Sequence, residues 1–528
     1  MDQPLPDART ARNAPRWRAP WMQALLLGLL CLGSFAAGLR GDFVLDDTYA
    51  ILQHPVVQGT APVADAFRLN FWGEPLSKDP PTLRPLATLS FALDHRLFGR
   101  SATAFHVSSL LWYIGLVLAG WAFARRCMSP GAALVAMAFF AGMPVHVENV
   151  TSLVGRADTQ AVLLSLLALL AVSPGIVEGK STTAGRLGLG ALAFAGGLLC
   201  KESIAVLPVI VALFVEYRRR RAEVRLSFLR AHVPSLVLFA ILGFYFVFRL
   251  RLLPRTFAYT ADDDVLVGAS LWEKAGYGVE LLARYLRLVV APTSLCAGRK
   301  YAEVFRPAHV SLAMVAGVGL LALVAYLSWR AYRKGGFPFV PAALLAWLLV
   351  TGLVFAMPES MADRFLLLPS LFLCLSLGPP LLSVWEKGRF GQALLLFALG
   401  AQAVLSSFQA RTWHDEGALW SHATQVCPDS VHNHYRYAEY LSQRGETAEA
   451  VWHYALVTKA RHAFPHAWSH PAKDEERSMP VDQRLHEMPR LLQISIDERT
   501  WRGRFSSYLR SLGRPREAKL VLETGPRE

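Results

Sequence analysis

Cysteine is scarce in this chain, and its few copies are spread widely. The six cysteines among 528 residues show neither the spacing of a metal site nor that of a disulfide framework. Three of them, Cys31, Cys200 and Cys374, lie within apolar runs and are interpreted as packing residues. Cys296 and Cys427 could both face an oxidising compartment, and a bridge between them stays open.

Apolar sequence is abundant, at 53% of all residues. Several apolar runs are long enough to cross a hydrocarbon core of about 30 Å, which predicts an all-α, polytopic membrane protein. The formal charge of +14 would suit a nucleic-acid-binding protein. The basic residues cluster in short loops between apolar runs, however, so we interpret the charge as membrane topology and expect no nucleic-acid partner.

About eleven membrane spans are expected, with the N-terminus in the cytoplasm and the C-terminus outside. Four arginines precede the first run, which we interpret as an uncleaved span, although a signal peptide would share these features. The loops assigned to the inside are all basic, as the positive-inside rule requires. The segment 276–292 carries charges at helical spacing and is expected to be an interfacial or re-entrant helix. The expected spans are 21–39, 107–124, 131–145, 159–173, 187–200, 204–217, 233–249, 309–328, 337–356, 365–384 and 391–408.

Three parts follow from this pattern. Residues 1–20 form a cytoplasmic segment, and residues 21–408 form the transmembrane core, whose first outer loop is 40–106. Residues 409–528 are polar and carry a repeat of about 34 residues, the period of tetratricopeptide (TPR) repeats. Trp420 and Tyr454 are one period apart, and Gly445 and Gly513 are two periods apart. A TPR-like helical domain on the outer side is expected, with an ordinary helical hairpin domain as the alternative.

Two adjacent aspartates, Asp46 and Asp47, follow the first apolar run. Ionisable residues this close to a bilayer are costly and are functional candidates by default. Other polar residues reach the same outer side from separate loops. Each of them alone could be an interfacial anchor or a helix cap, but together they mix carboxylates with cations. They are Arg84, His106, His146, Glu148, Arg156, Asp158, Lys201, Glu202, Glu359, Asp363 and Arg364.

Carboxylates beside cations on an outer membrane face suit one chemistry well. A carboxylate accepts a proton from an attacking hydroxyl, and Arg, Lys and His hold a lipid-linked phosphate that gains charge as it leaves. This predicts glycosyl transfer from a polyprenyl-phosphate sugar. A transporter would use similar residues but usually buries them at mid-membrane. The sequence shows no separate set of metal ligands.

Six motifs carry a family resemblance. They are GDFVLDDTYAILQHP, RPLATLSFALDHRLFG, FHVSSLLWY, HVENVTSLVGRAD, LLCKES and DRFLLLPS, in this order over residues 41–370. In this the chain resembles the transmembrane-and-TPR-containing O-mannosyltransferases and, more broadly, the GT-C glycosyltransferases. The resemblance implies a GT-C core, an essential acidic pair at Asp46–Asp47 and a second polar loop from His146 to Asp158. Metal is often not required in such enzymes, so no cofactor is expected and a divalent metal stays open.

The sequence thus predicts a membrane-embedded, inverting glycosyltransferase. Asp46 or Asp47 would act as the base with support from Glu148. The residues expected to bind the substrate or its lipid phosphate are Arg84, His106, His146, Arg156, Asp158, Lys201, Glu202 and Arg364. The donor would be a polyprenyl-phosphate sugar, with mannose one option, and the acceptor a protein or glycan bound through the TPR-like domain. The chain's compact, Arg- and Ala-rich composition is interpreted as bacterial, which would place the site in the periplasm. The alternatives are a non-catalytic TPR scaffold and a transporter or flippase of lipid-linked sugars.

Overall fold

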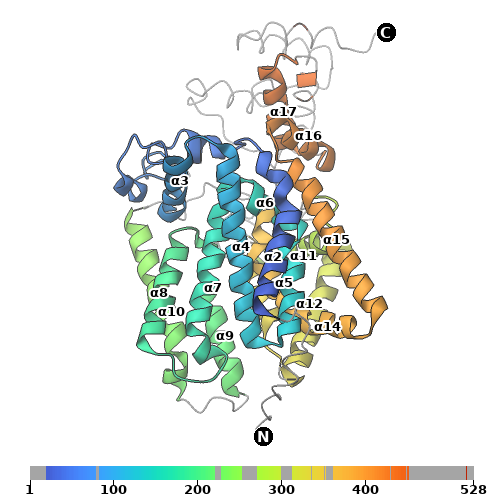
Figure 1. Ribbon diagram of the computed structural model, residues 1–528. Coiled ribbons are helices and arrows are strands. Elements are labelled where there is room, and N and C mark those ends of the chain that lie inside the picture. The colour runs from blue at the N-terminus through green and yellow to red at the C-terminus, as the bar shows by residue number, and fades with distance from the viewer. Residues whose placement is uncertain are drawn as a thin grey trace.

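The chain folds into helices that stand side by side (Figure 1). The computed structural model describes residues 19–78, 82–220, 227–252, 270–298, 312–334, 336–349, 351, 361–428, 430–446, 449–450, 453 and 519. Within these ranges there is no β-strand, and one isolated antiparallel bridge joins Leu69 and Pro75. The predicted all-α class is confirmed.

A helix lies at each of the expected spans. Inside a bilayer no water is available to pair with the backbone N–H and C=O groups of these apolar runs. A helix satisfies these groups with hydrogen bonds within the run itself. The helices are α2 (Pro20–Phe35), α4 (Ala102–Cys127), α5 (Pro130–Ala141), α7 (Arg156–Ile176), α8 (Ala184–Leu198), α9 (Leu207–Arg220), α10 (Phe228–Leu252), α12 (Leu312–Lys334), α13 (Phe339–Leu348), α14 (Leu367–Glu386) and α15 (Arg389–Arg411).

Six helical segments in the described ranges are each long and apolar enough to cross a membrane. A seventh candidate is α5 together with Pro144–Thr151, which bend by 56°. α5 ends at Ala141, four residues before the expected end of the span 131–145. Pro144 supplies no backbone N–H and disfavours a helical Met143, so the helix ends before it. The chain is an integral, multi-pass membrane protein, and the count of about eleven spans stays a prediction.

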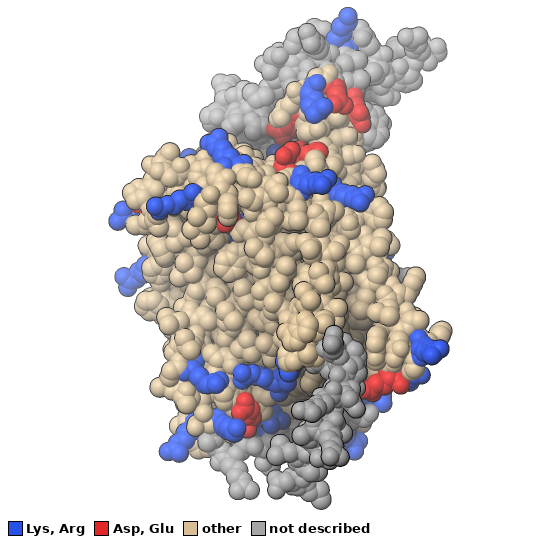
Figure 2. Space-filling view, viewed as in Figure 1, with Lys and Arg blue, Asp and Glu red and all other residues tan. Residues whose placement is uncertain are grey.

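The surface supports this assignment. Charged side chains gather mainly toward the two ends of the molecule and leave a broad zone with few of them in between (Figure 2). Leu192 of α8, Phe244 of α10 and Phe397 of α15 are each more than 70% exposed. Large apolar side chains exposed over several helices suit contact with lipid better than contact with water.

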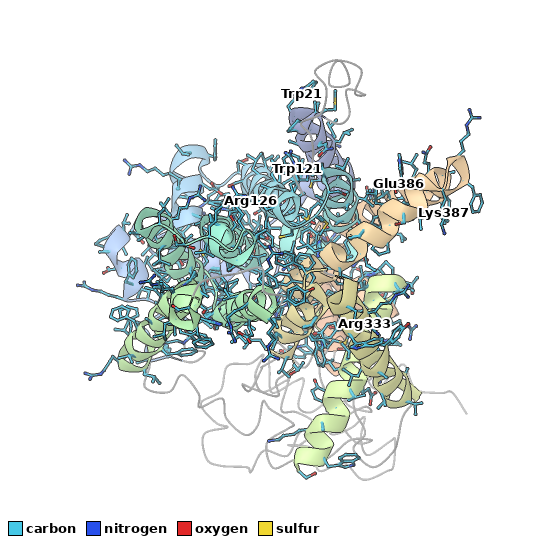
Figure 3. All side chains as sticks on the ribbon, turned by 90° about the horizontal axis from the view of Figure 1, so that it is seen from below. Trp21, Trp121, Arg126, Arg333, Glu386 and Lys387 are labelled. Carbon is cyan, nitrogen blue, oxygen red and sulfur yellow. The ribbon has the colours of Figure 1, made fainter. Side chains whose placement is uncertain are left out.

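Loops assigned to the inside converge at one end. Figure 3, which views the molecule from the end carrying the N-terminus, shows Arg126, Arg333 and Lys387 at the ends of α4, α12 and α14. Glu178 lies 3.9 Å from Arg126 and 3.1 Å from Lys180, which joins two of these basic segments. The predicted clustering of basic loops is thus present in three dimensions.

The remaining helices frame the opposite end or cover the bundle. α3 (Pro85–Phe98) and α6 (Val147–Thr151) lie at the end away from the N-terminus (Figure 1). α11 (Leu271–Val290) buries Tyr277, Leu281 and Tyr285 in the core, and its interfacial placement stays a prediction.

The C-terminal part begins with two packed helices, α16 (Glu416–Val426) and α17 (Val431–Gln443). They also lie at the end away from the N-terminus (Figure 1). Most of the predicted repeat, including Tyr454 and Gly513, lies outside the described residues. Both the TPR-like domain and the ordinary hairpin therefore stay predictions. Cys296 and Cys427 are not joined by a disulfide in the structure.

Candidate active site

The loop after α2 holds the acidic pair in an unusual backbone conformation. Leu45 has φ = 54°, and it is the one non-glycine residue with positive φ in the described part of the chain. Bulky residues rarely adopt this left-handed conformation because the Cβ crowds the backbone. The turn places the two neighbouring carboxylates, Asp46 and Asp47, in different environments.

Asp47 is fully buried and tied to the backbone. One carboxylate oxygen accepts a hydrogen bond from the Val44 N–H at 3.1 Å, and the other accepts one from the Val154 N–H at 3.0 Å. Burial raises the pKa of Asp47 to about 7, and the neighbouring charge of Asp46 adds to the rise. Asp47 therefore fastens the acidic loop to the segment that precedes α7.

Asp46 is exposed on the surface, and charged groups lie around it. Desolvation raises the pKa of Asp46 above its ordinary value, and the charge of Glu148 adds to this. Cations pull the pKa in the opposite direction; they are Arg364, Arg436 and Arg84. A carboxylate with this accessibility and these neighbours can meet a substrate from outside.

Glu148 and Arg364 form a double link between two distant motifs. The Arg364 backbone N–H donates to one Glu148 carboxylate oxygen at 2.8 Å, and its guanidinium pairs with the other. Asn149 donates in turn to the Arg364 carbonyl at 3.2 Å. A Cβ on Gly155 would lie 2.5 Å from the Glu148 carbonyl oxygen, so any side chain at this position would clash with the backbone of Glu148. Glu148 thus orients Arg364.

Lys201, Glu202 and Arg84 extend this group of charges. The Lys201 ammonium lies 2.5 Å from an Asp158 carboxylate oxygen, while burial and the charges of Arg84 and Arg364 lower the pKa of Lys201. Burial alone would raise the pKa of Glu202, but the surrounding cations outweigh it and lower the value to about 2. Arg84 sits 4.8 Å from the Phe71 ring centre, and its Nε has no hydrogen-bond partner among the described residues.

Arg156, predicted to bind phosphate, lies elsewhere and is fully buried. Its guanidinium donates to Asp94 at 2.5 Å, to Ser109 at 3.0 Å and to the Phe105 carbonyl at 2.7 Å. The Arg156 guanidinium carbon lies over the face of the Phe91 ring, 4.6 Å from the ring centre. Each guanidinium nitrogen of Arg156 thus has a partner within the protein, and the side chain is fully buried.

Two predicted histidines are also buried apart from the charged group. The His146 ring nitrogens lie 2.8 Å from the Tyr113 hydroxyl and 2.8 Å from the Ser370 hydroxyl. His106 lies 3.4 Å from the Asp42 carbonyl oxygen, behind the acidic loop. Both hold helices and loops together in this structure. Of the remaining candidates, Glu359 lies outside the described residues, and Asp363 accepts a hydrogen bond from the Cys296 backbone.

Sequence reasoning missed several groups that surround the acids. Arg249 lies 3.4 Å from Glu202 and 3.0 Å from the Tyr245 hydroxyl. A basic residue at the end of a span that is predicted to lie outside departs from the positive-inside rule, and that departure was the available signal. Glu416 of α16 contacts the acidic loop at Leu45, and the charge of Arg436 in α17 lowers the pKa of Asp46; no motif pointed to either residue. No group of three His, Cys, Asp or Glu side chains that could hold a metal occurs in the described residues.

Comparisons with known proteins agree with the predicted resemblance. A profile of the family described as dolichyl-phosphate-mannose-protein mannosyltransferase matches residues 79–244. The human protein O-mannosyl-transferase TMTC1 is 27% identical over 521 residues, covering 83% of this chain and 55% of its own length. Tmtc2 of Drosophila melanogaster is 33% identical over 276 residues, covering 51% of this chain and 29% of its own.

This chain spans little more than half the length of the human relative. Among solved structures, the oligosaccharyltransferase AglB of Archaeoglobus fulgidus, in complex with an inhibitory peptide and a dolichol-phosphate, has a TM-score of 0.45 at 12% identity. That match covers 75% of this chain and 56% of the archaeal one. On the sequence matches, the chain is similar to proteins named as protein O-mannosyl-transferases.

Proposed function

We propose that this protein transfers a sugar from a polyprenyl-phosphate carrier to a hydroxyl group of a protein or glycan. The observation that carries the proposal is the exposed Asp46 carboxylate within the electrostatic reach of Arg364, Arg84 and Glu148, of which Arg364 and Glu148 form an ion pair. These residues come from four separate segments of the chain, and the fold brings them together. The printed names of the sequence relatives, protein O-mannosyl-transferases, support the same chemistry.

Asp46 is the base in this proposal. It takes the proton of the acceptor hydroxyl, whose oxygen attacks the anomeric carbon of the sugar. The bond between that carbon and the phosphate oxygen breaks, and the polyprenyl phosphate leaves with its negative charge. One displacement inverts the anomeric configuration. Asp47 holds the loop and does not itself meet the acceptor, because its carboxylate is buried and bonded to two backbone amides.

Arg84, Lys201 and Arg364 receive the leaving phosphate. Fixed cations stabilise charge that develops in the transition state without having to reorganise first. Glu148 and Asp158 keep Arg364 and Lys201 in place through their ion pairs. Mannose is the sugar that the names of the relatives favour. A dolichol-type and an undecaprenyl-type carrier present the same phosphate, so the carrier is to be found by experiment.

The site is proposed to face away from the cytoplasm. It lies at the end opposite the basic loops, which the positive-inside rule assigns to the cytoplasm. In a bacterium this end would meet the periplasm, where lipid-phosphate sugars are the expected donors. The C-terminal helices at the same end would then present the acceptor.

Transfer of radiolabelled sugar from polyprenyl-phosphate mannose to outer-face proteins tests the proposal in membranes that contain the full chain. Asp46→Asn is expected to lower the rate by about 10²–10⁴-fold, the usual contribution of a general base. Asp42→Asn, an exposed aspartate of the same loop, is the matched control and keeps full activity. Full activity of Asp46→Asn contradicts the assignment. Movement of the lipid-linked sugar without sugar transfer would support a flippase. The absence of both sugar transfer and lipid movement would support a scaffold.

A further inference from the structure

The left-handed backbone at Leu45 needs an external support. A bulky residue pays for positive φ with steric strain, and such a conformation persists where the surroundings hold it. Leu45 immediately precedes Asp46, so its φ angle sets the direction in which the Asp46 carboxylate leaves the chain. Whatever holds Leu45 therefore also aims the proposed base.

The support comes from the C-terminal part of the chain, 371 residues away. The Leu45 N–H donates to one carboxylate oxygen of Glu416 at 2.5 Å. The second carboxylate oxygen accepts from the indole N–H of Trp420 at 2.5 Å, and Trp420 is buried. Glu416 is thus fixed by α16 on one side and holds the acidic loop on the other.

The same two segments also meet through a backbone hydrogen bond and a close approach of their backbones. The Asp42 N–H donates to the His414 carbonyl at 2.8 Å, and a Cβ on Gly41 would lie 3.3 Å from the Trp413 carbonyl oxygen. Capping of α16 does not require Glu416, because the neighbouring Asp415 side chain accepts from the Ala418 N–H at 2.8 Å. The Glu416 carboxylate is therefore not used as the helix cap: one oxygen accepts from Leu45 of the loop and the other from Trp420 of its own helix.

We infer that Glu416 is a positioning residue of the transferase: from α16 it holds Leu45 in the left-handed conformation and thereby orients Asp46. The inference rests on the proposed function. It makes the first turn of the C-terminal helical part a component of the catalytic centre, in addition to any role in holding the acceptor. Without Glu416 the loop would relax toward ordinary φ values, and Asp46 would leave its position beside Arg84 and Arg364.

The test is a double-mutant cycle on the full-length protein in detergent, with kcat and KM measured for a polyprenyl-phosphate sugar. Glu416→Ala is expected to lower kcat by roughly ten- to a hundredfold with little change in the donor KM, as for a displaced catalytic group. Leu45→Gly should restore part of the kcat in the Glu416→Ala background, because glycine adopts positive φ without support. Leu45→Gly in the wild-type background should not raise kcat.

Two controls separate positioning from folding. Asp415→Ala disturbs the start of α16 but leaves the contact with Leu45, so Leu45→Gly should not rescue it. Glu446→Ala removes an exposed ion pair with Arg444 and should keep wild-type kcat. Strictly additive effects of Leu45→Gly and Glu416→Ala, or full activity of Glu416→Ala, overturn the inference. If the wild-type protein transfers no sugar, the proposed function fails instead.

Discussion

Two groups of charges near the same end of the bundle differ in how completely the protein satisfies them. Around Arg156 all three guanidinium nitrogens have protein partners and the group is buried. Around Asp46 the carboxylate is exposed, and the Nε of the neighbouring Arg84 lacks a hydrogen bond among the described residues. A closed network stabilises one fold, whereas an open one keeps binding capacity for a ligand. The same residue types thus serve structure in one place and, in the proposed function, chemistry in the other.

The largest expected effect comes from opening the closed group. Arg156→Met leaves the Asp94 carboxylate buried without its cation, and breaking such a pair costs about 3–5 kcal/mol. A large drop in the thermal unfolding midpoint in detergent is the measurement. Asp94→Leu added to Arg156→Met removes the unpaired charge and should recover most of the loss. A stable Arg156→Met single variant would show that the group is not a structural one.

Emptying the open group should affect activity instead of stability. Arg84→Met keeps an apolar side chain against Phe71 but removes a cation from the proposed phosphate site. We expect kcat/KM for the lipid-linked donor to fall by about 10²–10³-fold, the usual cost of one transition-state donor. The unfolding midpoint should stay close to that of the wild type. Arg68→Met, an exposed arginine of the same outer loop paired with Asp65, is the control and should change neither quantity.

The buried member of the acidic pair gives a smaller, pH-dependent effect on stability. The pKa of Asp47 is raised in the folded protein to about 7, above its unfolded value of about 3.9. Its contribution to stability is therefore complete below the unfolded pKa and is lost as the pH rises through 7. Unfolding midpoints measured from pH 5 to 8 should fall more steeply for the wild type than for Asp47→Asn, which cannot ionise. Parallel curves would contradict the raised pKa.

Much of the fold was predictable because apolar runs and basic loops act locally. A helix lies at each expected span, and these spans are apolar runs with few charges. The break after Ala141 was missed, since its cause is one proline inside an otherwise apolar run. The composition of that run gave no hint of the bend.

The site was predictable in part. Asp46, Arg84, Glu148, Lys201 and Arg364 do gather, as the motifs indicated. Partner choice could not be deduced, because it depends on which helices pack together. Arg156 meets Asp94 of α3, 62 residues earlier, and nothing in the local sequence distinguishes it from Arg364. Glu416 lies 371 residues from the loop that it holds, beyond the reach of any local pattern.

The smallest expected effect is that of chelation. A metal in a glycosyl transfer site would neutralise the phosphate that leaves with the carrier lipid. Here three side-chain cations, Arg84, Lys201 and Arg364, are proposed to supply that charge. We therefore expect sugar transfer by the purified protein to be unchanged in excess EDTA, with rates compared before and after adding Mg²⁺ or Mn²⁺. Loss of activity that either ion restores would contradict the assignment of phosphate binding to the cations alone. Repeating the test on Arg84→Met makes it sharper. If the site depends on protein cations, the rate of sugar transfer should rise little when a divalent ion is added. If the site binds a metal, the added ion should raise the rate in both the wild type and Arg84→Met.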